Sequence, residues 1–163
     1  MNGVMRMDVS VRRMNDMLTE AYRSIIKVEE LMLIDLSGGK LTLSEMHVLE
    51  SVGKASGKSL TITEIAQDLD ITPPSVTTMI QRLERKGYIA KDRSSVDARR
   101  VHVVLTEEGR QAEIAHRYFR RKIIRELTAE LDVAEKAAIL TGLEKMNAFI
   151  RRQIGEYTAG KED

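Results

Sequence analysis

Apolar residues recur at helical spacing along most of the 163-residue chain, and only one short segment alternates between apolar and polar positions. The longest regular series takes alternating three- and four-residue steps, typical of a helix, through Val11, Met14, Leu18, Ala21, Ile25, Val28 and Met32. Glycines and helix-start signals divide the rest of the pattern. Together these features predict helices that begin near residues 11, 42, 61, 72, 106 and 132 and end near residues 36, 57, 69, 87, 127 and 155.

The starts of these predicted helices carry side chains that can satisfy free backbone amides. Three pairs have the spacing of a capping box, in which each partner bonds the other's backbone: Thr42 with Glu45, Thr61 with Glu64, and Asp132 with Glu135. Thr72 is a good N-cap, and Pro73 suits the first helical turn. Thr106 is expected to cap the helix after it, and Gly87 to end the helix before it.

Two short predicted helices stand a tight turn apart in the middle of the chain. Tyr88–Lys91 is then predicted as a short strand, Arg93–Arg100 as a polar turn, and Val101–Leu105 as the returning strand. This order is typical of a winged helix-turn-helix, which places one helix in the DNA major groove and a basic loop beside it. We therefore expect a mainly α fold, an α+β winged helix-turn-helix, with its DNA-binding lobe over residues 42–106.

Helical stretches over residues 8–36 and 107–157 flank this central lobe, and neither is large enough to form its own core. The N-terminal series either is buried within its own domain or packs partly against another subunit. We expect the second, with one domain over residues 1–163 that forms a homodimer through its terminal helices. A dimer presents two recognition helices to a pseudo-palindromic site. The residues expected at the dimer seam are Val11, Met14, Leu18, Leu143, Met146 and Ile150.

Positive charge is concentrated in one segment. The chain as a whole has a net charge of +1, yet residues 82–100 hold seven cations and three anions, a local charge of +4. A basic patch on a nearly neutral protein is typical of a protein that binds DNA. Cysteine is absent from the sequence, which excludes disulfides, thiolate metal sites and thiol-based redox sensing.

Several other classes of protein are disfavoured by the sequence. The three histidines lack H-x-x-x-H or a similar metal-binding spacing, and there is no P-loop, G-x-G-x-x-G or Ser–His–Asp set. We therefore expect neither an enzyme nor a bound cofactor or metal. The N-terminus has no apolar core of a secretory signal, and the longest apolar run, Leu31–Ile34, is too short to span a bilayer. We expect a cytoplasmic protein without contact to a membrane.

The outward face of the second helix of the predicted motif carries polar and basic side chains. Arg82 has the donors for a bidentate contact with guanine, and Gln81 matches adenine. Arg85 and Lys86 lie deeper in the helix, where they either contact phosphates or pair with Glu84. The candidate DNA-binding residues are Thr72, Ser75, Thr77, Thr78, Gln81, Arg82, Arg85, Arg93, Arg99 and Arg100.

Arg99 and Arg100 stand out because an arginine at a wing tip can enter the minor groove, where narrow A·T-rich DNA concentrates negative potential. Asp97 does not favour DNA by its charge. It either orients an arginine of the wing or simply suits the turn.

Residues 61–110 resemble the DNA-binding lobe of the MarR-type transcriptional regulators. The resemblance is carried by LERKGYI at the end of the recognition helix, Asp97-x-Arg99-Arg100 in the wing, and LTEEG at the start of the next helix. It implies a dimeric regulator of transcription, with repression as its expected action. In this family a small hydrophobic ligand generally binds between the lobes and releases the DNA.

Within that family, Glu45-Met46-His47, Gly53-Lys54 and the residues from Arg93 to Asp97 are similar to FabT-type repressors. That similarity implies control of fatty-acid biosynthesis genes, with long-chain acyl carrier protein as co-repressor. The basic run Arg120-Arg121-Lys122 is then either a solvated helix face or a contact for the acidic carrier protein. Likewise, the nine methionines either pack the core and seam or line an acyl-binding site.

Two further alternatives stay open. His47, near the expected hinge between the lobes, is either a satisfied polar residue or part of an effector pocket. The fold itself could also serve a ligand-binding or protein-interaction module that no longer binds DNA, although the basic wing argues against this. Neither the operator nor the effector follows from the sequence.

Overall fold

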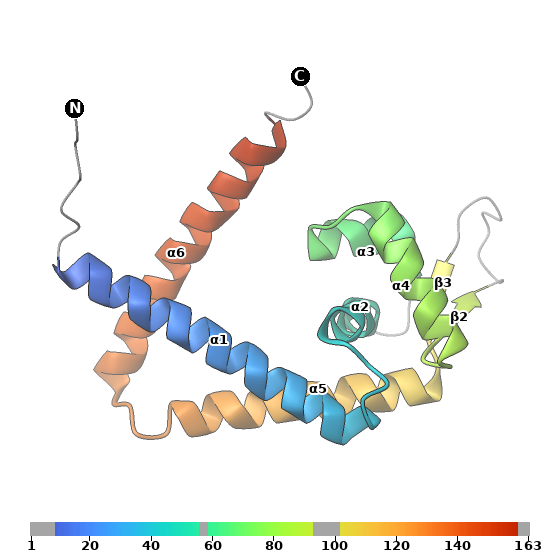
Figure 1. The fold of residues 1–163 in the computed structure, drawn as a ribbon, viewed down its shortest axis with the longest axis horizontal. Coiled ribbons are helices and arrows are strands. Elements are labelled where there is room, and N and C mark those ends of the chain that lie inside the picture. Colours follow the sequence, from blue (N-terminus) through green and yellow to red (C-terminus); the bar gives the residue numbers. More distant parts are fainter. Residues whose placement is uncertain (1–8, 56–58, 93–101, 160–163) are drawn as a thin grey trace. The chain divides into compact units, whose positions relative to one another are not determined.

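The computed structural model describes residues 9–55, 59–92 and 102–159 as a helical chain with a small antiparallel sheet (Figure 1). Six helices and three strands lie in these ranges: α1 (Val9–Ser37), α2 (Leu43–Lys54), β1 (Leu60–Thr61), α3 (Ile62–Leu69), α4 (Pro73–Arg85), β2 (Ile89–Asp92), β3 (His102–Leu105), α5 (Glu107–Leu127) and α6 (Val133–Ala159). The expected winged helix-turn-helix fold is therefore confirmed.

The chain forms two compact units, one over residues 1–118 and the other over residues 119–163. The first unit contains α1 to α4, the sheet and the first half of α5. The second contains the rest of α5 and α6. In none of the described helices is an apolar stretch long enough to cross a membrane.

The core of the first unit is built where α2, α3 and α4 pack on one another and on the sheet. Its largest fully buried apolar side chains include Met46, Leu49, Ile65, Leu83 and Val103. Only the last turns of α1 join this core, through Leu33 and its neighbours. Burial of these side chains holds the motif together, because each contributes about 1.5–3 kcal/mol relative to an exposed position.

All three predicted capping boxes form. The amides of Glu45 and Glu64 lie 3.3 and 3.2 Å from the hydroxyls of Thr42 and Thr61, and the glutamate side chains accept in return. Asp132 and Glu135 make the same reciprocal pair at 2.8 and 2.9 Å. These bonds fix where α2, α3 and α6 begin.

Thr72 is at the N-cap position of α4, as predicted, but its side chain makes no capping bond. Its hydroxyl lies 2.9 Å from the hydroxyl of Ser75 instead. The turn before it depends on Asp70, which has the left-handed backbone conformation with φ of 54°. Asp70 is the one non-glycine among the described residues with positive φ. Aspartate tolerates this left-handed conformation better than most residues because its side chain is short and polar.

The sheet has the order β1-β3-β2, with both neighbouring pairs antiparallel. Leu60 pairs with Val103, and Ile89 pairs with Leu105. The sequence pattern did not reveal β1, because two residues are too short for a visible alternation. β3 therefore joins the strand before α3 to the strand after α4, at the two ends of the helix-turn-helix motif.

Two helix ends differ from the sequence prediction. α2 ends at Lys54, before the predicted stop at Gly57, and Ala55 is its C-cap residue. α6 continues to Ala159 although fraying was expected near Gly155. A glycine inside a helix costs only about 1 kcal/mol, so a long helix can continue through one.

Candidate nucleic-acid interface

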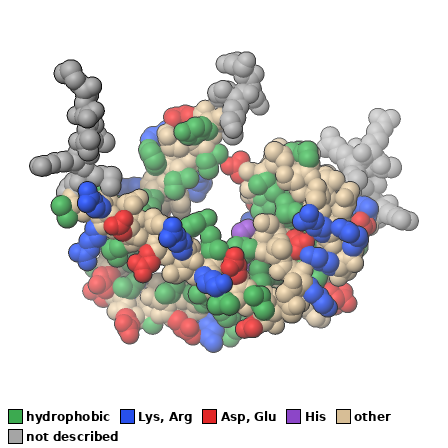
Figure 2. Space-filling view, in the orientation of Figure 1, with side chains coloured by type: hydrophobic (Ala, Val, Ile, Leu, Met, Phe, Trp, Pro, Cys, Tyr) green, Lys and Arg blue, Asp and Glu red, His purple; other side chains and the backbone are tan. Residues whose placement is uncertain are grey.

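Helix α4 has one buried and one exposed face. Val76, Ile80 and Leu83 are buried in the core of the first unit. The opposite side exposes polar and basic residues: Thr72, Ser75, Thr78, Gln81, Arg82 and Arg85, with Thr77 half-buried at its edge. Lys and Arg side chains gather over α4 in the space-filling view (Figure 2). The structure thus brings the candidate residues of this helix together on one accessible surface.

The first turn of α4 contains no acidic residue and has prolines at its first two positions. Its positive dipole end is therefore not neutralised by a carboxylate of its own turn. Further along, the hydroxyls of Thr77 and Thr78 donate to the carbonyl oxygens of Pro73 and Pro74 at 2.9 and 3.1 Å. Because both hydroxyl protons are used in these bonds, Thr77 and Thr78 can only accept a hydrogen bond from a further partner.

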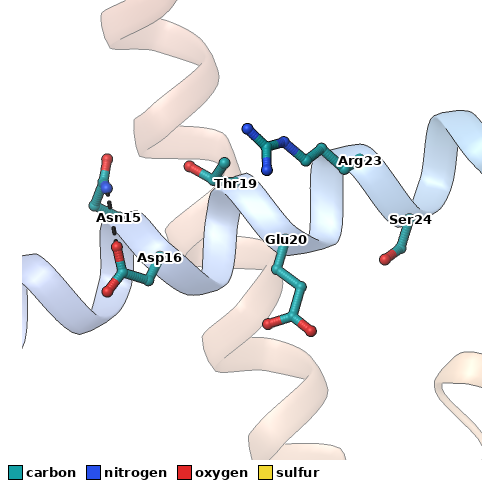
Figure 3. A pocket seen from close by; sticks show the side chains of 6 residues that line it. All are labelled: Asn15, Asp16, Thr19, Glu20, Arg23 and Ser24. Carbon is teal, nitrogen blue, oxygen red and sulfur yellow. Dashed lines mark hydrogen bonds between the residues drawn. The ribbon is translucent and has the colours of Figure 1, made fainter.

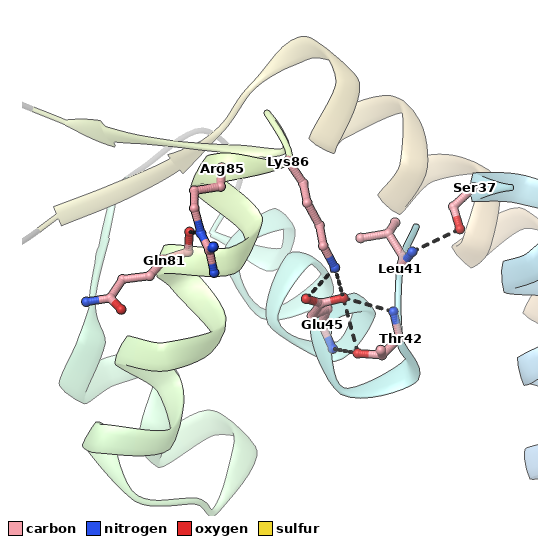
Figure 4. Close-up of polar contacts among 7 residues, drawn as sticks. All are labelled: Ser37, Leu41, Thr42, Glu45, Gln81, Arg85 and Lys86. Carbon is pink, nitrogen blue, oxygen red and sulfur yellow. Dashed lines mark hydrogen bonds and ion pairs between the residues drawn. The ribbon is translucent and has the colours of Figure 1, made fainter. Parts of the chain in front are cut away.

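The long side chains of Gln81 and Arg85 lie on the exposed face of α4. In Figure 4, Gln81 points away from the polar cluster around Glu45, and Arg85 lies along α4 beside the backbone of Gln81. The Nε atom of Arg85 lies 3.4 Å from the carbonyl oxygen of Gln81. Because this bond uses one of five guanidinium donors, Arg85 retains donors suited to phosphate or base acceptors.

Lys86 behaves differently from its neighbours. Its Nζ lies 2.7 Å from both carboxylate oxygens of Glu45, at the start of α2 (Figure 4). Of the two alternatives predicted for Lys86, the pairing with Glu84 is therefore wrong. Glu84 instead lies 2.8 Å from Nζ of Lys91 in β2. The sequence could not show this, because Glu45 is 41 residues away from Lys86.

The Glu45 side chain is only 2% exposed, and burial by itself would raise its pKa. The hydrogen bond from Lys86, the bond from the Thr42 backbone and the positive charge of Lys86 outweigh that effect and lower the pKa of Glu45 below its ordinary value. Glu45 is thus a buried carboxylate held in its charged form by partners from two helices.

Gly87 and Thr106 join the end of α4 to the start of α5. Gly87 has φ of 81°, which lets the chain turn sharply and lets the Tyr88 amide bond the Leu83 carbonyl at 2.9 Å. The Thr106 hydroxyl donates to the Gly87 carbonyl at 2.7 Å and accepts from the Gly109 amide at 3.0 Å. Gly109 passes so close to the Tyr88 carbonyl that a Cβ atom there would overlap it.

These features recur in proteins of known type. The family model described as MarR family matches residues 41–101. FabT of Streptococcus pneumoniae, solved in complex with DNA, is 30% identical and has a TM-score of 0.82, over 87% of this chain and 98% of that one. The chain belongs to the MarR family.

Two curated relatives from Bacillus subtilis strain 168 are similar to part of this MarR-family chain. The HTH-type transcriptional repressor MdtR is 32% identical over 96 residues, which are 59% of this chain and 61% of that protein. The uncharacterised HTH-type transcriptional regulator YhjH is 28% identical over 109 residues, 63% and 61% of the two lengths. The match therefore spans about three fifths of each relative. These relatives are named as regulators of transcription, which agrees with the expectation that the chain is not an enzyme.

The wing of this MarR-family lobe is framed by β2 and β3, whose register pairs Asp92 with His102. The candidate residues Arg93, Asp97, Arg99 and Arg100 lie outside the described residues. Their roles therefore remain predictions from the sequence.

His47, the residue expected to line an effector pocket, is half-buried on α2. A surface hollow beside α1 is lined by Asn15, Asp16, Thr19, Glu20, Arg23 and Ser24 (Figure 3). All six are exposed polar residues of one helix, so the hollow lacks the apolar enclosure of a typical small-molecule site. His47 as a pocket residue stays a prediction.

Sequence reasoning did not single out the pairing of His116 with Glu50. The His116 ring is fully buried, and its Nδ1 lies 2.8 Å from Oε1 of Glu50, which joins α5 to α2 within the first unit. Neither residue belongs to a motif, and their spacing of 66 positions hides the contact. Only the three-dimensional structure reveals it.

The six predicted seam residues lie on α1 and α6. Val11, Met14, Leu18, Leu143 and Ile150 are 43–60% exposed, and Met146 is half-buried. Other large apolar side chains of the same helices are exposed as well, among them Met17, Tyr22, Leu140 and Phe149. Such extended apolar faces are typical of surfaces that a partner covers.

Proposed function

We propose that this MarR-family chain is a sequence-specific DNA-binding regulator of transcription that acts as a homodimer on a pseudo-palindromic operator. The observation that carries the proposal is the face of α4, where Gln81, Arg82 and Arg85 are exposed while the opposite face is buried. This is the geometry required for a helix that enters the major groove. The solved complex of the similar FabT with DNA supports the same use of the fold.

The exposed apolar faces of α1 and α6 support the homodimer. A recognition helix is short and contacts only a few base pairs, so two copies held at a fixed spacing gain both affinity and specificity. In this proposal Val11, Met14, Leu18, Leu143, Met146 and Ile150 are covered by the second copy, and residues 42–106 form the DNA-binding lobe between the dimerisation helices.

Repression of fatty-acid biosynthesis genes is the more specific form of the proposal. It is supported by similarity to FabT over nearly the whole chain, and it makes long-chain acyl carrier protein the co-repressor. The alternative within the family is a regulator released from DNA by a small hydrophobic or phenolic ligand. The two predict opposite results, because a co-repressor must bind the DNA-bound form more tightly and an inducer the free form.

A salt titration tests the central proposal. Duplexes selected by the protein from a random-sequence library serve as specific DNA, and their dissociation constants are measured between about 50 and 200 mM salt. Binding through several phosphates should weaken steeply over that range, by up to about 10³-fold. If no salt-sensitive binding to duplex DNA is found, the chain is better explained as a ligand-binding or protein-interaction module on the same fold.

The pathway is tested separately. Long-chain acyl carrier protein is added to the protein–DNA complex in a gel-shift assay, with the unacylated carrier protein as control. Strengthening by the acylated form alone supports the FabT-like role. Unchanged or weaker binding contradicts that role without affecting the proposal that the chain binds DNA.

A further inference from the structure

We propose that Glu45 and Lys86 form a positioning pair that sets the orientation of α4, and that Lys86 does not contact DNA phosphate. The inference rests on the proposed DNA-binding function. It removes from the DNA contact surface one of the seven cations counted between residues 82 and 100, and it assigns that residue a different task.

The pair is built into the fold at both ends. Glu45 is the N3 residue of α2, and Oε2 accepts both from the Thr42 amide at 2.9 Å and from Nζ of Lys86 at 2.7 Å. Lys86 is the C-cap residue of α4, and its amide bonds the carbonyl of Arg82 at 3.0 Å. The same carboxylate therefore fixes the beginning of α2 and the end of α4.

The charge on Lys86 is already neutralised where it lies. Its Nζ meets both oxygens of a carboxylate that is 2% exposed, and the lysine side chain is itself only 33% exposed. Moving Nζ out to a phosphate would leave a buried charge without its principal cationic partner, which is strongly unfavourable. Arg82 and Arg85 are exposed and involve no such loss.

Because the pair lies at the C-terminal end of α4, a small change in the pair can displace the residues at the other end of the helix. α4 has 13 residues, and at 1.5 Å per residue its far end lies roughly 20 Å from the pair. A tilt of about 5° at the C-terminal end would then move the first turn by about 1–2 Å. That displacement exceeds the tolerance of a hydrogen bond to a base edge, which weakens outside about 2.7–3.2 Å.

The test compares Lys86→Met with Arg85→Met, since both remove one cation from the same end of α4. Each variant binds a specific duplex selected by the wild-type protein and an unrelated duplex, over a series of salt concentrations, with active protein counted by stoichiometric titration. We expect K86M to weaken specific binding by about 10-fold without changing the salt slope. R85M should reduce the slope by about 0.9, the value for one lost phosphate contact.

Glu45→Gln should weaken specific binding in the same way as K86M, and the double variant should be little worse than either single one, because the two residues act as a unit. Binding to the unrelated duplex should change little in all three. Counting active protein separates this effect from a lower folded fraction, and a merely stabilising pair would leave the affinity per active molecule unchanged.

Two results would overturn the positioning role. In one, K86M lowers the salt slope as R85M does, so that Lys86 is a phosphate contact. In the other, K86M unfolds more easily but binds DNA normally per active molecule, so that the pair only stabilises. If the wild-type protein itself shows no salt-sensitive binding, the proposed function fails first and this inference fails with it.

Discussion

Nδ1 of His116 lies 2.8 Å from Oε1 of Glu50, and this contact joins α5 to α2 beneath a surface that leaves the histidine ring completely buried. When Glu50 is ionised, Nδ1 is the donor of this hydrogen bond, because a carboxylate only accepts. The other ring nitrogen, Nε2, has no hydrogen-bond partner within the described structure. The ring is thus both a polar link between two helices and a space-filling part of the core.

We predict that His116→Ala lowers the free energy of unfolding by about 2–4 kcal/mol, because it removes the hydrogen bond to Glu50 and leaves a cavity. Chemical denaturation measures the change. His47→Ala is the control, because His47 is half-buried on α2. We expect its effect to stay below about 1 kcal/mol. If both variants lose the same free energy of unfolding, the hydrogen bond between His116 and Glu50 makes no particular contribution to stability.

Gly109→Ala should destabilise the fold by about 3 kcal/mol, because the new methyl group meets the backbone carbonyl of Tyr88 and neither backbone can move without repacking. Gly142→Ala provides the matched control in α6, where the added Cβ has open space around it. That variant should be neutral or up to about 1 kcal/mol more stable, since alanine favours a helix over glycine. Thermal or urea denaturation of both variants checks the pair of predictions.

The proposed seam predicts that Leu143→Glu shifts the protein from dimer to monomer, because a buried carboxylate without a partner opposes association. Thr141→Glu introduces the same charge two residues away, toward another side of α6, and should leave the dimer intact. Sedimentation velocity at several protein concentrations distinguishes the two forms. A dimeric L143E protein would remove this position from the seam.

The depressed pKa of Glu45 predicts how stability depends on pH. A carboxyl group whose folded pKa lies below its unfolded value of about 4.5 stabilises the fold above that pH, and the contribution disappears as the pH falls through the folded pKa. The stability difference between wild type and Glu45→Gln should be about 1.5–3 kcal/mol near neutral pH. It should shrink once the pH falls below about 4.5. A difference that stays constant down to pH ~3 would contradict the charged pair.

The wing can be tested without knowledge of its conformation. Replacing Arg99 and Arg100 together by alanine should weaken DNA binding and reduce the salt slope by up to about 1.8, or 0.9 for each lost phosphate contact. The dimer and the melting temperature should not change. An unaltered affinity would assign DNA binding to α4 alone.

The sequence predicted those parts of the fold whose signals are local. The caps at Thr42, Thr61 and Asp132 and the turn at Gly87 each depend on residues a few positions apart, and the structure confirms each of them. β1 was missed because its two residues become a strand only through pairing with β3. Local patterns carry no information about such distant partners.

The same distinction applies to the candidate site. A helical period suffices to place Gln81, Arg82 and Arg85 on one exposed face of α4. It could not identify the partner of Lys86, because that residue, Glu45, stands on another helix. Charge counted along the sequence therefore does not show that one of these cations, Lys86, is paired with a buried carboxylate.

The hydroxyl of Thr106 also restricts how α4 and α5 can move relative to each other. Through its bonds to Gly87 and Gly109, one oxygen atom connects the second residue after α4 to the first turn of α5. Two helices tied this closely at their ends have little freedom to rotate separately. We therefore expect the start of α5 and the end of α4 to move together as one piece.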